Sequence, residues 1–155
     1  MKTILLALST TRQSPKTIDY ALKKAQREKA HLIILFIVDP DLPHLVLDKM
    51  LDVGFMGDKP SMKLYRSILK EYRERGKKKT EEISRAANSL GIEWSIRIAE
   101  GEFTAECLKV IKDKNPEMTI LTRTERSRLS RFLHGSAVNR LKQKSRCSII
   151  IIKEE

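Results

Sequence analysis

Short apolar runs alternate with amphipathic stretches along most of the chain. Thr3 to Leu8 and Leu32 to Val38 are almost continuously apolar, as expected for strands buried on both faces of a parallel sheet. Between them, Ser14 and Pro15 are typical of the N-cap and the first position of a helix. Strand, helix and strand in this order predict two parallel strands joined by a right-handed crossover.

The rest of the chain continues this alternation. The spacing of apolar residues predicts a helix from Ser61 to Leu90, about 45 Å long at roughly 1.5 Å per residue. Such a helix must overhang a small sheet or contact something beyond it. Ile92 to Ala99 is predicted as the third strand, with Trp94, Ile96 and Ile98 on one face, and a helix follows it. Met118 to Leu121 and Ser148 to Ile152 are predicted as the fourth and fifth strands. Residues 41–60 are irregular, and either a lid or a short helix pair fits them.

No repeat or linker interrupts this order, so residues 1–155 are predicted to form one domain, an open α/β sheet with helices on both faces. No apolar run is long enough to span a membrane and no signal peptide is evident, which predicts a cytoplasmic protein without a membrane partner. Cys107 and Cys147 are far apart and are interpreted as reduced core thiols.

The charge of the chain is strongly basic, with 31 basic and 20 acidic residues and a formal net charge of +11. Much of the excess positive charge falls between Arg123 and Arg146. This segment contains eight basic residues and a single acidic residue, Glu125. A second run, from Lys77 to Lys79, lies in the long helix and is interpreted as a solvated face. Attraction for anionic ligands is therefore expected near the end of the fourth strand.

A candidate anion site follows that strand. Gly135 and Ser136 open a short helical segment, and backbone N–H groups at such a helix start can hold a phosphate. Ser/His/Asp and Cys/His sets cannot be assembled from the spacing of the residues, and no metal-ligand cluster stands out. The sequence thus predicts no catalytic residue and no metal site, and any hydrolysis of a ligand bound there would be slow and incidental.

Five segments in the right order resemble the universal stress protein family over nearly the full length. They are Ile4 to Ser9, His31 to Pro40, Ala99 to Glu102, Leu133 to Ser136 and Cys147 to Ile152. The resemblance implies a Rossmann-like five-stranded parallel sheet of order 3-2-1-4-5. It also implies a homodimer in which the last strands meet, here Ile149, Ile150, Ile151 and Ile152.

The resemblance also implies where a nucleotide would bind. Nucleotide-binding members carry Gly, two residues, Gly, nine residues and Gly-Ser or Gly-Thr, and Thr122 and Glu125 occupy the first two glycine positions here. Ser9 stands where ATP-binding members have an aspartate. A β-branched residue resists the positive φ that glycine adopts, and a carboxylate beside a polyphosphate costs about 1 to 4 kcal/mol. Val38 could offer its backbone N–H and C=O to a base.

Three interpretations of the site remain open. Gly135 and Ser136 could merely cap the last helix, or the site could hold ATP or AMP with magnesium through arginines in place of glycine amides. Nucleic-acid binding through the basic segment is the least favoured, because aromatic residues do not interleave with its charges. The first predicts a binding or regulatory protein with an unidentified protein partner and no required cofactor. The candidate site residues are Ser9, Val38, Leu121, Thr122, Arg123, Glu125, Arg126, Gly135, Ser136 and Ala137.

Overall fold

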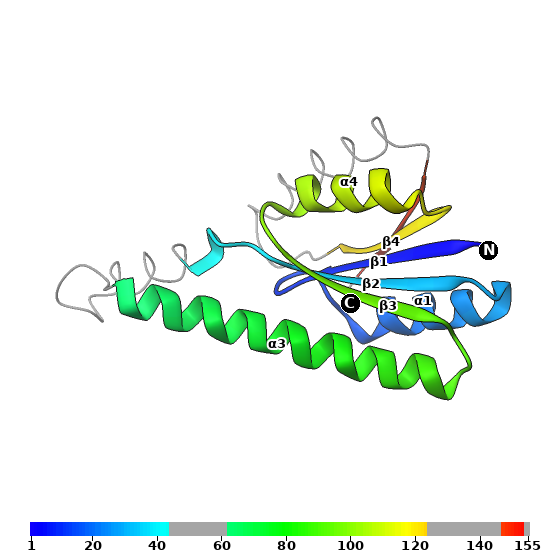
Figure 1. Ribbon diagram of the computed structural model, residues 1–155, viewed down its shortest axis with the longest axis horizontal. Helices are drawn as coiled ribbons and strands as arrows, with labels where there is room; N and C mark the ends of the chain where they lie inside the picture. Colours follow the sequence, from blue (N-terminus) through cyan, green and yellow to red (C-terminus); the bar gives the residue numbers. More distant parts are fainter. Residues whose placement is uncertain (44–61, 124–146, 154–155) are drawn as a thin grey trace.

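The computed structural model describes residues 1–43, 62–123 and 147–153. Its strands form one parallel sheet in the order β3-β2-β1-β4-β5 (Figure 1), which confirms the predicted sheet. The strands are β1 (Thr3–Ser9), β2 (His31–Val38), β3 (Trp94–Glu100), β4 (Met118–Arg123) and β5 (Ser148–Lys153). The helices are α1 (Pro15–Glu28), α3 (Met62–Ser89) and α4 (Phe103–Lys114).

The predicted strands are all present, but several of their ends differ from the prediction. β3 runs from Trp94 to Glu100, whereas the prediction was Ile92 to Ala99. β4 continues through Arg123, so the prediction that this strand ends at Leu121 was wrong. The reason is the pairing of each strand with its neighbour, since Glu100 lies opposite Val38 and Arg123 lies opposite Lys153.

Helices α1 and α3 cover one face of the sheet (Figure 1). Alternate residues of β1, namely Ile4, Leu6 and Leu8, point into this core. As predicted, Ser14 caps α1, because its side chain accepts a hydrogen bond from the backbone N–H of Thr17, and Pro15 is the first helical residue.

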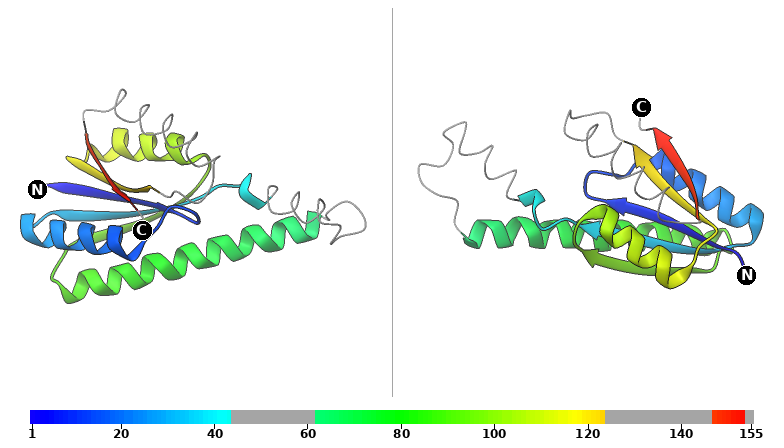
Figure 2. Two further views of the ribbon diagram at one scale, coloured as in Figure 1. Left: turned by 180° about the vertical axis from the view of Figure 1, so that it is seen from behind. Right: turned by 90° about the horizontal axis from the view of Figure 1, so that it is seen from above.

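α3 approaches this face so closely that one position requires glycine. A Cβ atom placed on Gly76 would lie 2.5 Å from Cδ1 of Phe36, whose side chain is fully buried. Near the helix start, the Tyr65 hydroxyl donates a 2.8 Å hydrogen bond to the carbonyl of Pro40. Beyond these contacts the helix runs past the sheet, as the sequence predicted (Figures 1 and 2).

Helix α4 covers the opposite face of the sheet. Phe103, Cys107 and Val110 of the helix pack against Leu5 and Ala7 of β1. Burial raises the pKa of the Cys107 thiol, which therefore stays protonated. Both cysteines are free, as expected, but Cys147 is only half-buried.

Candidate functional site

The strand order fixes where a crevice opens. β1 pairs with β2 on one side and with β4 on the other. In an open parallel sheet the connections diverge at such a point, and a crevice forms beyond the carboxyl ends of the two central strands. Ser9 ends β1 and Arg123 ends β4 there. We call this place the β1–β4 crevice.

On the α1 side of the crevice, three hydroxyl groups form a chain that we call the hydroxyl chain. The Thr122 hydroxyl donates a 2.8 Å hydrogen bond to Oγ1 of Thr17, which lies 2.8 Å from Oγ of Ser14. All three residues are buried. Ser14 Oγ also accepts a hydrogen bond from the backbone N–H of Thr17. The hydroxyl chain therefore connects the start of α1 to the end of β4.

Thr122 therefore does not take the place of a loop glycine in the way the sequence suggested. It lies in extended backbone, opposite Ile152 of β5, and its side chain faces α1. Among the described residues, the only non-glycine positions with positive φ are Lys29 and Asn115, and both terminate helices. The conflict between a β-branched residue and positive φ does not arise at Thr122, because the strand simply extends through it.

On the α4 side, the crevice is bordered by a tight turn at the end of β1. The backbone groups of Ser9 and Arg12 bond to each other in both directions, at 3.1 and 3.2 Å. The Ser9 hydroxyl accepts the backbone N–H of Arg12 at 3.1 Å. The predicted site residue Ser9 is thus at the crevice, but its hydroxyl already takes part in the turn.

Arg12 is the residue that sequence reasoning missed. Its guanidinium lies over the ring of Phe103, 4.5 Å from the centroid, an arrangement that attracts the cation electrostatically. Burial lowers the pKa of Arg12, partly offset by the nearby Glu102 carboxylate, yet an arginine stays charged at every physiological pH. The sequence showed a basic residue after the first strand, but not that Phe103 would lie beneath it.

Arg123 is a second cation at this end of the sheet. It follows Leu121 by two residues in β4, and Leu121 belongs to the core under α4. Because side chains alternate along a strand, Arg123 is placed on the α4 side, the same side as Arg12. The α4 side of the crevice therefore carries two arginines from neighbouring strand ends.

Two hydroxyl oxygens next to this region are buried and have no hydrogen-bond partner among the described residues. They belong to Thr10, which follows β1, and to Thr104, which follows Phe103. Buried hydroxyl groups are normally satisfied, so a ligand or an ordered water at either oxygen would gain a hydrogen bond.

Val38 ends β2, as predicted, but its carbonyl is engaged. It accepts a 3.1 Å hydrogen bond from the backbone N–H of Gly101. Gly101 has φ of 156°, and a Cβ there would lie 2.5 Å from Oε1 of Glu106, so only glycine fits this turn. A base at Val38 would have to share that carbonyl.

Half of the candidate site lies outside the described residues. The same is true of most of the irregular segment 41–60. The site positions concerned are Glu125, Arg126, Gly135, Ser136 and Ala137.

A cavity in the described structure lies away from the crevice. Its volume is about 420 Å³, and it is lined by Met1, the end of α1 and the turn from Leu90 to Glu93. These residues lie at the amino ends of the strands, whereas the crevice is at their carboxyl ends. This cavity is therefore not part of the predicted site.

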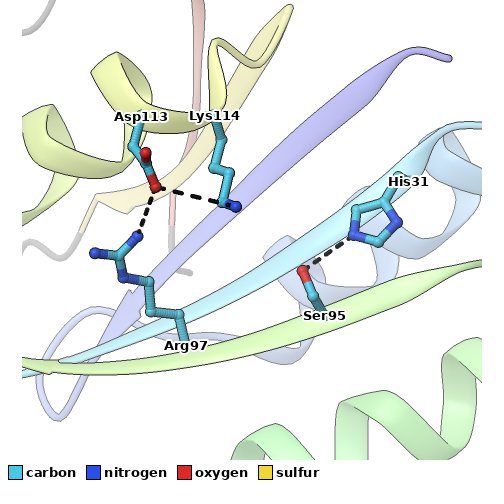
Figure 3. A network of polar contacts seen from close by, with 5 residues as sticks. All are labelled: His31, Ser95, Arg97, Asp113 and Lys114. Atoms are coloured by element: carbon cyan, nitrogen blue, oxygen red, sulfur yellow. Dashed lines mark hydrogen bonds and ion pairs between the residues drawn. The ribbon is translucent and has the colours of Figure 1, made fainter.

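The outer part of the α4 face is polar. His31 Nε2 and Ser95 Oγ lie 3.0 Å apart, and the Arg97 guanidinium lies 3.3 Å from the Asp113 carboxylate (Figure 3). Lys114 adds a weaker contact to the same carboxylate, at 4.0 Å. These are exposed surface contacts.

Among the helices that the structure describes, none has the length and hydrophobicity of a membrane-spanning segment.

Comparison with known proteins identifies the relatives of this chain. The profile of the universal stress protein family matches residues 1–153. No curated protein matches the sequence significantly.

Solved structures resemble the chain over nearly its full length. UspA from Lactobacillus plantarum is 16% identical with a TM-score of 0.70, and 97% of each chain is covered. A universal stress protein solved in complex with cAMP is 15% identical, with a TM-score of 0.61 and coverage of 99% of this chain and 98% of the other. A family protein from Arabidopsis thaliana, solved with AMP bound, is 15% identical, with a TM-score of 0.57 and coverage of 100% and 93%. At such identities these similarities show the fold alone.

Proposed function

Because the chain belongs to the universal stress protein family, we propose that it is a binding and regulatory protein whose crevice does not hold ATP through loop glycines. It is not primarily an enzyme in this proposal. Its output is an interaction with a partner protein.

The hydroxyl chain carries this proposal. A glycine at position 122 would leave room for the backbone to approach a ribose, but Thr122 is 1% exposed and bonds to Thr17 instead. The polar groups on this side of the crevice satisfy one another. A ligand there would have to break a hydrogen bond that already exists, which costs about 1 to 3 kcal/mol.

A second function is favoured by Arg12. In this alternative the crevice binds AMP or ATP, with magnesium for ATP, and arginines hold the phosphates. Arg12 and Arg123 on the α4 side would act together with Arg126, which lies outside the described residues. The buried hydroxyls of Thr10 and Thr104, which have no partner within the described ranges, support a ligand near this end of the sheet. The cAMP and AMP complexes of two relatives support a nucleotide as that ligand.

Calorimetric titration separates the two functions. The purified protein, checked for co-purified nucleotide, is titrated with Mg-ATP, AMP and cAMP at about 150 mM salt, where surface electrostatics are largely screened. No heat up to millimolar ligand is expected from the first proposal. Micromolar binding would overturn it and support the second.

Variants then test which residues bind. If arginines hold the phosphates, Arg12→Ala and the Arg123→Ala/Arg126→Ala pair should abolish binding, whereas Glu125→Gly should strengthen it. Arg27→Ala is the matched control, because Arg27 is exposed in the last turn of α1, far from the crevice. Unchanged affinity in all these variants would contradict the arginine mechanism.

We also propose that β5 mediates a homodimer. Ile149 to Ile152 form an edge strand in which each isoleucine is only partly buried. An exposed apolar edge invites pairing with another strand. Ile151→Lys should produce a monomer in light scattering, whereas Ile98→Lys on the opposite edge strand, 41% exposed, should not. A dimer that survives Ile151→Lys would exclude this interface.

A further inference from the structure

An exposed stripe of basic residues runs along α3. At about 100° per residue, its members fall within about 80° of the helix circumference, over a length of roughly 21 Å. We call it the α3 stripe. It consists of Lys63, Arg66, Lys70, Arg73 and Lys77, all exposed.

Most of these charges are not neutralised within the described structure. Arg73 forms an ion pair with Glu100 at the end of β3. For the other four, the described ranges show no ion pair. Glu74 borders the stripe, and Glu81 lies just beyond its end. Four basic groups therefore point into solvent in a row.

The stripe begins where α3 projects beyond the sheet and continues along the part of the helix that packs on the sheet. The first buried residue of the helix is Leu69, so Lys63 and Arg66 belong to the projecting end seen in Figures 1 and 2. The first turn contains no acidic residue. Because the amino end of a helix is itself partially positive, the potential of this end is raised further.

We infer that the α3 stripe binds the phosphodiester backbone of nucleic acid, independently of sequence. A row of cations separated by one helical turn fits a linear polyanion, and such contacts supply most of non-specific nucleic-acid affinity. The apolar face of α3 is packed on the sheet through residues such as Leu69 and Tyr72. Among the large apolar side chains of the described helix only Met62 is exposed, and a single side chain does not form the apolar face that insertion into lipid requires. This function goes beyond the proposed crevice function and does not depend on it.

The position of the stripe differs from the sequence expectation. The sequence assigned the basic surface to Arg123–Arg146 and the run from Lys77 to Lys79 to a solvated face. Consecutive lysines on a helix point about 100° apart, so the lysines of that run do not share one side of α3. Lys77 belongs to the stripe, and Lys78 is exposed on a different side of the helix. The stripe arises instead from residues three and four apart.

Fluorescence anisotropy with a labelled duplex of about 20 base pairs, measured from about 50 to 200 mM salt, tests this inference. The test variant is Lys63→Gln/Arg66→Gln/Lys70→Gln, which leaves the Arg73 ion pair intact. The matched control is Lys16→Gln/Arg27→Gln/Lys112→Gln, which removes two lysines and one arginine from exposed positions elsewhere. Circular dichroism confirms that both remain folded.

We expect the wild-type protein to bind with a steep salt dependence. In the stripe variant the slope of log affinity against log salt should fall by about 3, and affinity at the lowest salt by at least about tenfold. The control should keep the wild-type slope. Equal weakening in both variants, or no binding by the wild type, would overturn the inference. Equally tight, stripe-dependent binding of polyglutamate would also overturn it, in favour of an acidic protein surface.

Discussion

The two faces of the sheet use their polar and apolar residues differently. On the α1 and α3 face, Gly76 touches Phe36 and the hydroxyl chain satisfies its own members. On the α4 face, Arg12 lies over Phe103, and exposed polar contacts line β3 (Figure 3). The first face holds the fold together by close contact. The second face carries charged groups and solvent-exposed polar contacts, which contribute less to the packing of the core.

The largest effect should come from filling the closest contact on the α1 and α3 face. Gly76→Val places atoms where the Phe36 ring already lies, and the ring is buried and cannot move aside. Overpacking of this kind should lower the free energy of unfolding by about 2 to 3 kcal/mol. Urea denaturation measures this change.

Lys78→Val is the control, because Lys78 is exposed on the same helix. Only the difference in helix propensity, about 0.5 kcal/mol, is expected there. Equal losses in the two variants would mean that α3 is not held closely at Gly76.

The hydroxyl chain should give the next largest effect. Thr17→Val keeps the shape of the side chain but removes its bonds to Ser14 and Thr122. Two buried hydroxyls then lose a partner, which should lower the free energy of unfolding by about 1 to 3 kcal/mol. Thermal denaturation provides the measurement, with Thr11→Val at an exposed loop position as the comparison. A loss of stability smaller than that of Thr11→Val would show that the hydroxyl chain does not stabilise the start of α1.

A pH-dependent effect is expected from Asp39, which follows β2. Burial raises the pKa of Asp39, and the Asp41 and Glu102 carboxylates act in the same direction, against a backbone hydrogen bond from Asp41. A carboxyl group with a raised pKa in the folded state lowers stability at neutral pH, and this penalty disappears as pH falls below its ordinary pKa.

Asp39→Asn should therefore stabilise the protein slightly at pH 7, by less than about 1 kcal/mol after solvent screening. At pH 3 the variant and the wild type should have nearly equal stability. Asparagine can still accept the Asp41 N–H, so the turn is kept. A larger gain at pH 3 than at pH 7 would reverse the assigned direction of the pKa shift.

The smallest effect should come from the exposed contacts of the α4 face. In the Arg97 and Asp113 pair, the side chains are 45% and 58% exposed. Exposed pairs contribute little, so Arg97→Ala should change the free energy of unfolding by less than about 0.5 kcal/mol. Denaturation at low and high salt measures it, and a loss above about 1 kcal/mol would place this contact among the stabilising ones.

The sequence by itself determined the order and type of the described elements. Apolar runs such as Thr3 to Leu8 specify strands buried on both faces, and Ser14 with Pro15 specifies a helix start, because these signals are local. The five-stranded order came from the resemblance to the family and was confirmed. The ends of β3 and β4 were misplaced, because pairing with a neighbouring strand decides where a strand stops.

Only the tertiary structure decided how the crevice is lined. Thr122 meets Thr17, and Arg12 meets Phe103, although each pair is far apart in the sequence. The α3 stripe likewise depends on which side of the helix packs on the sheet. Such contacts follow from strand register and helix rotation, which the packing of the whole core sets and which no local pattern encodes.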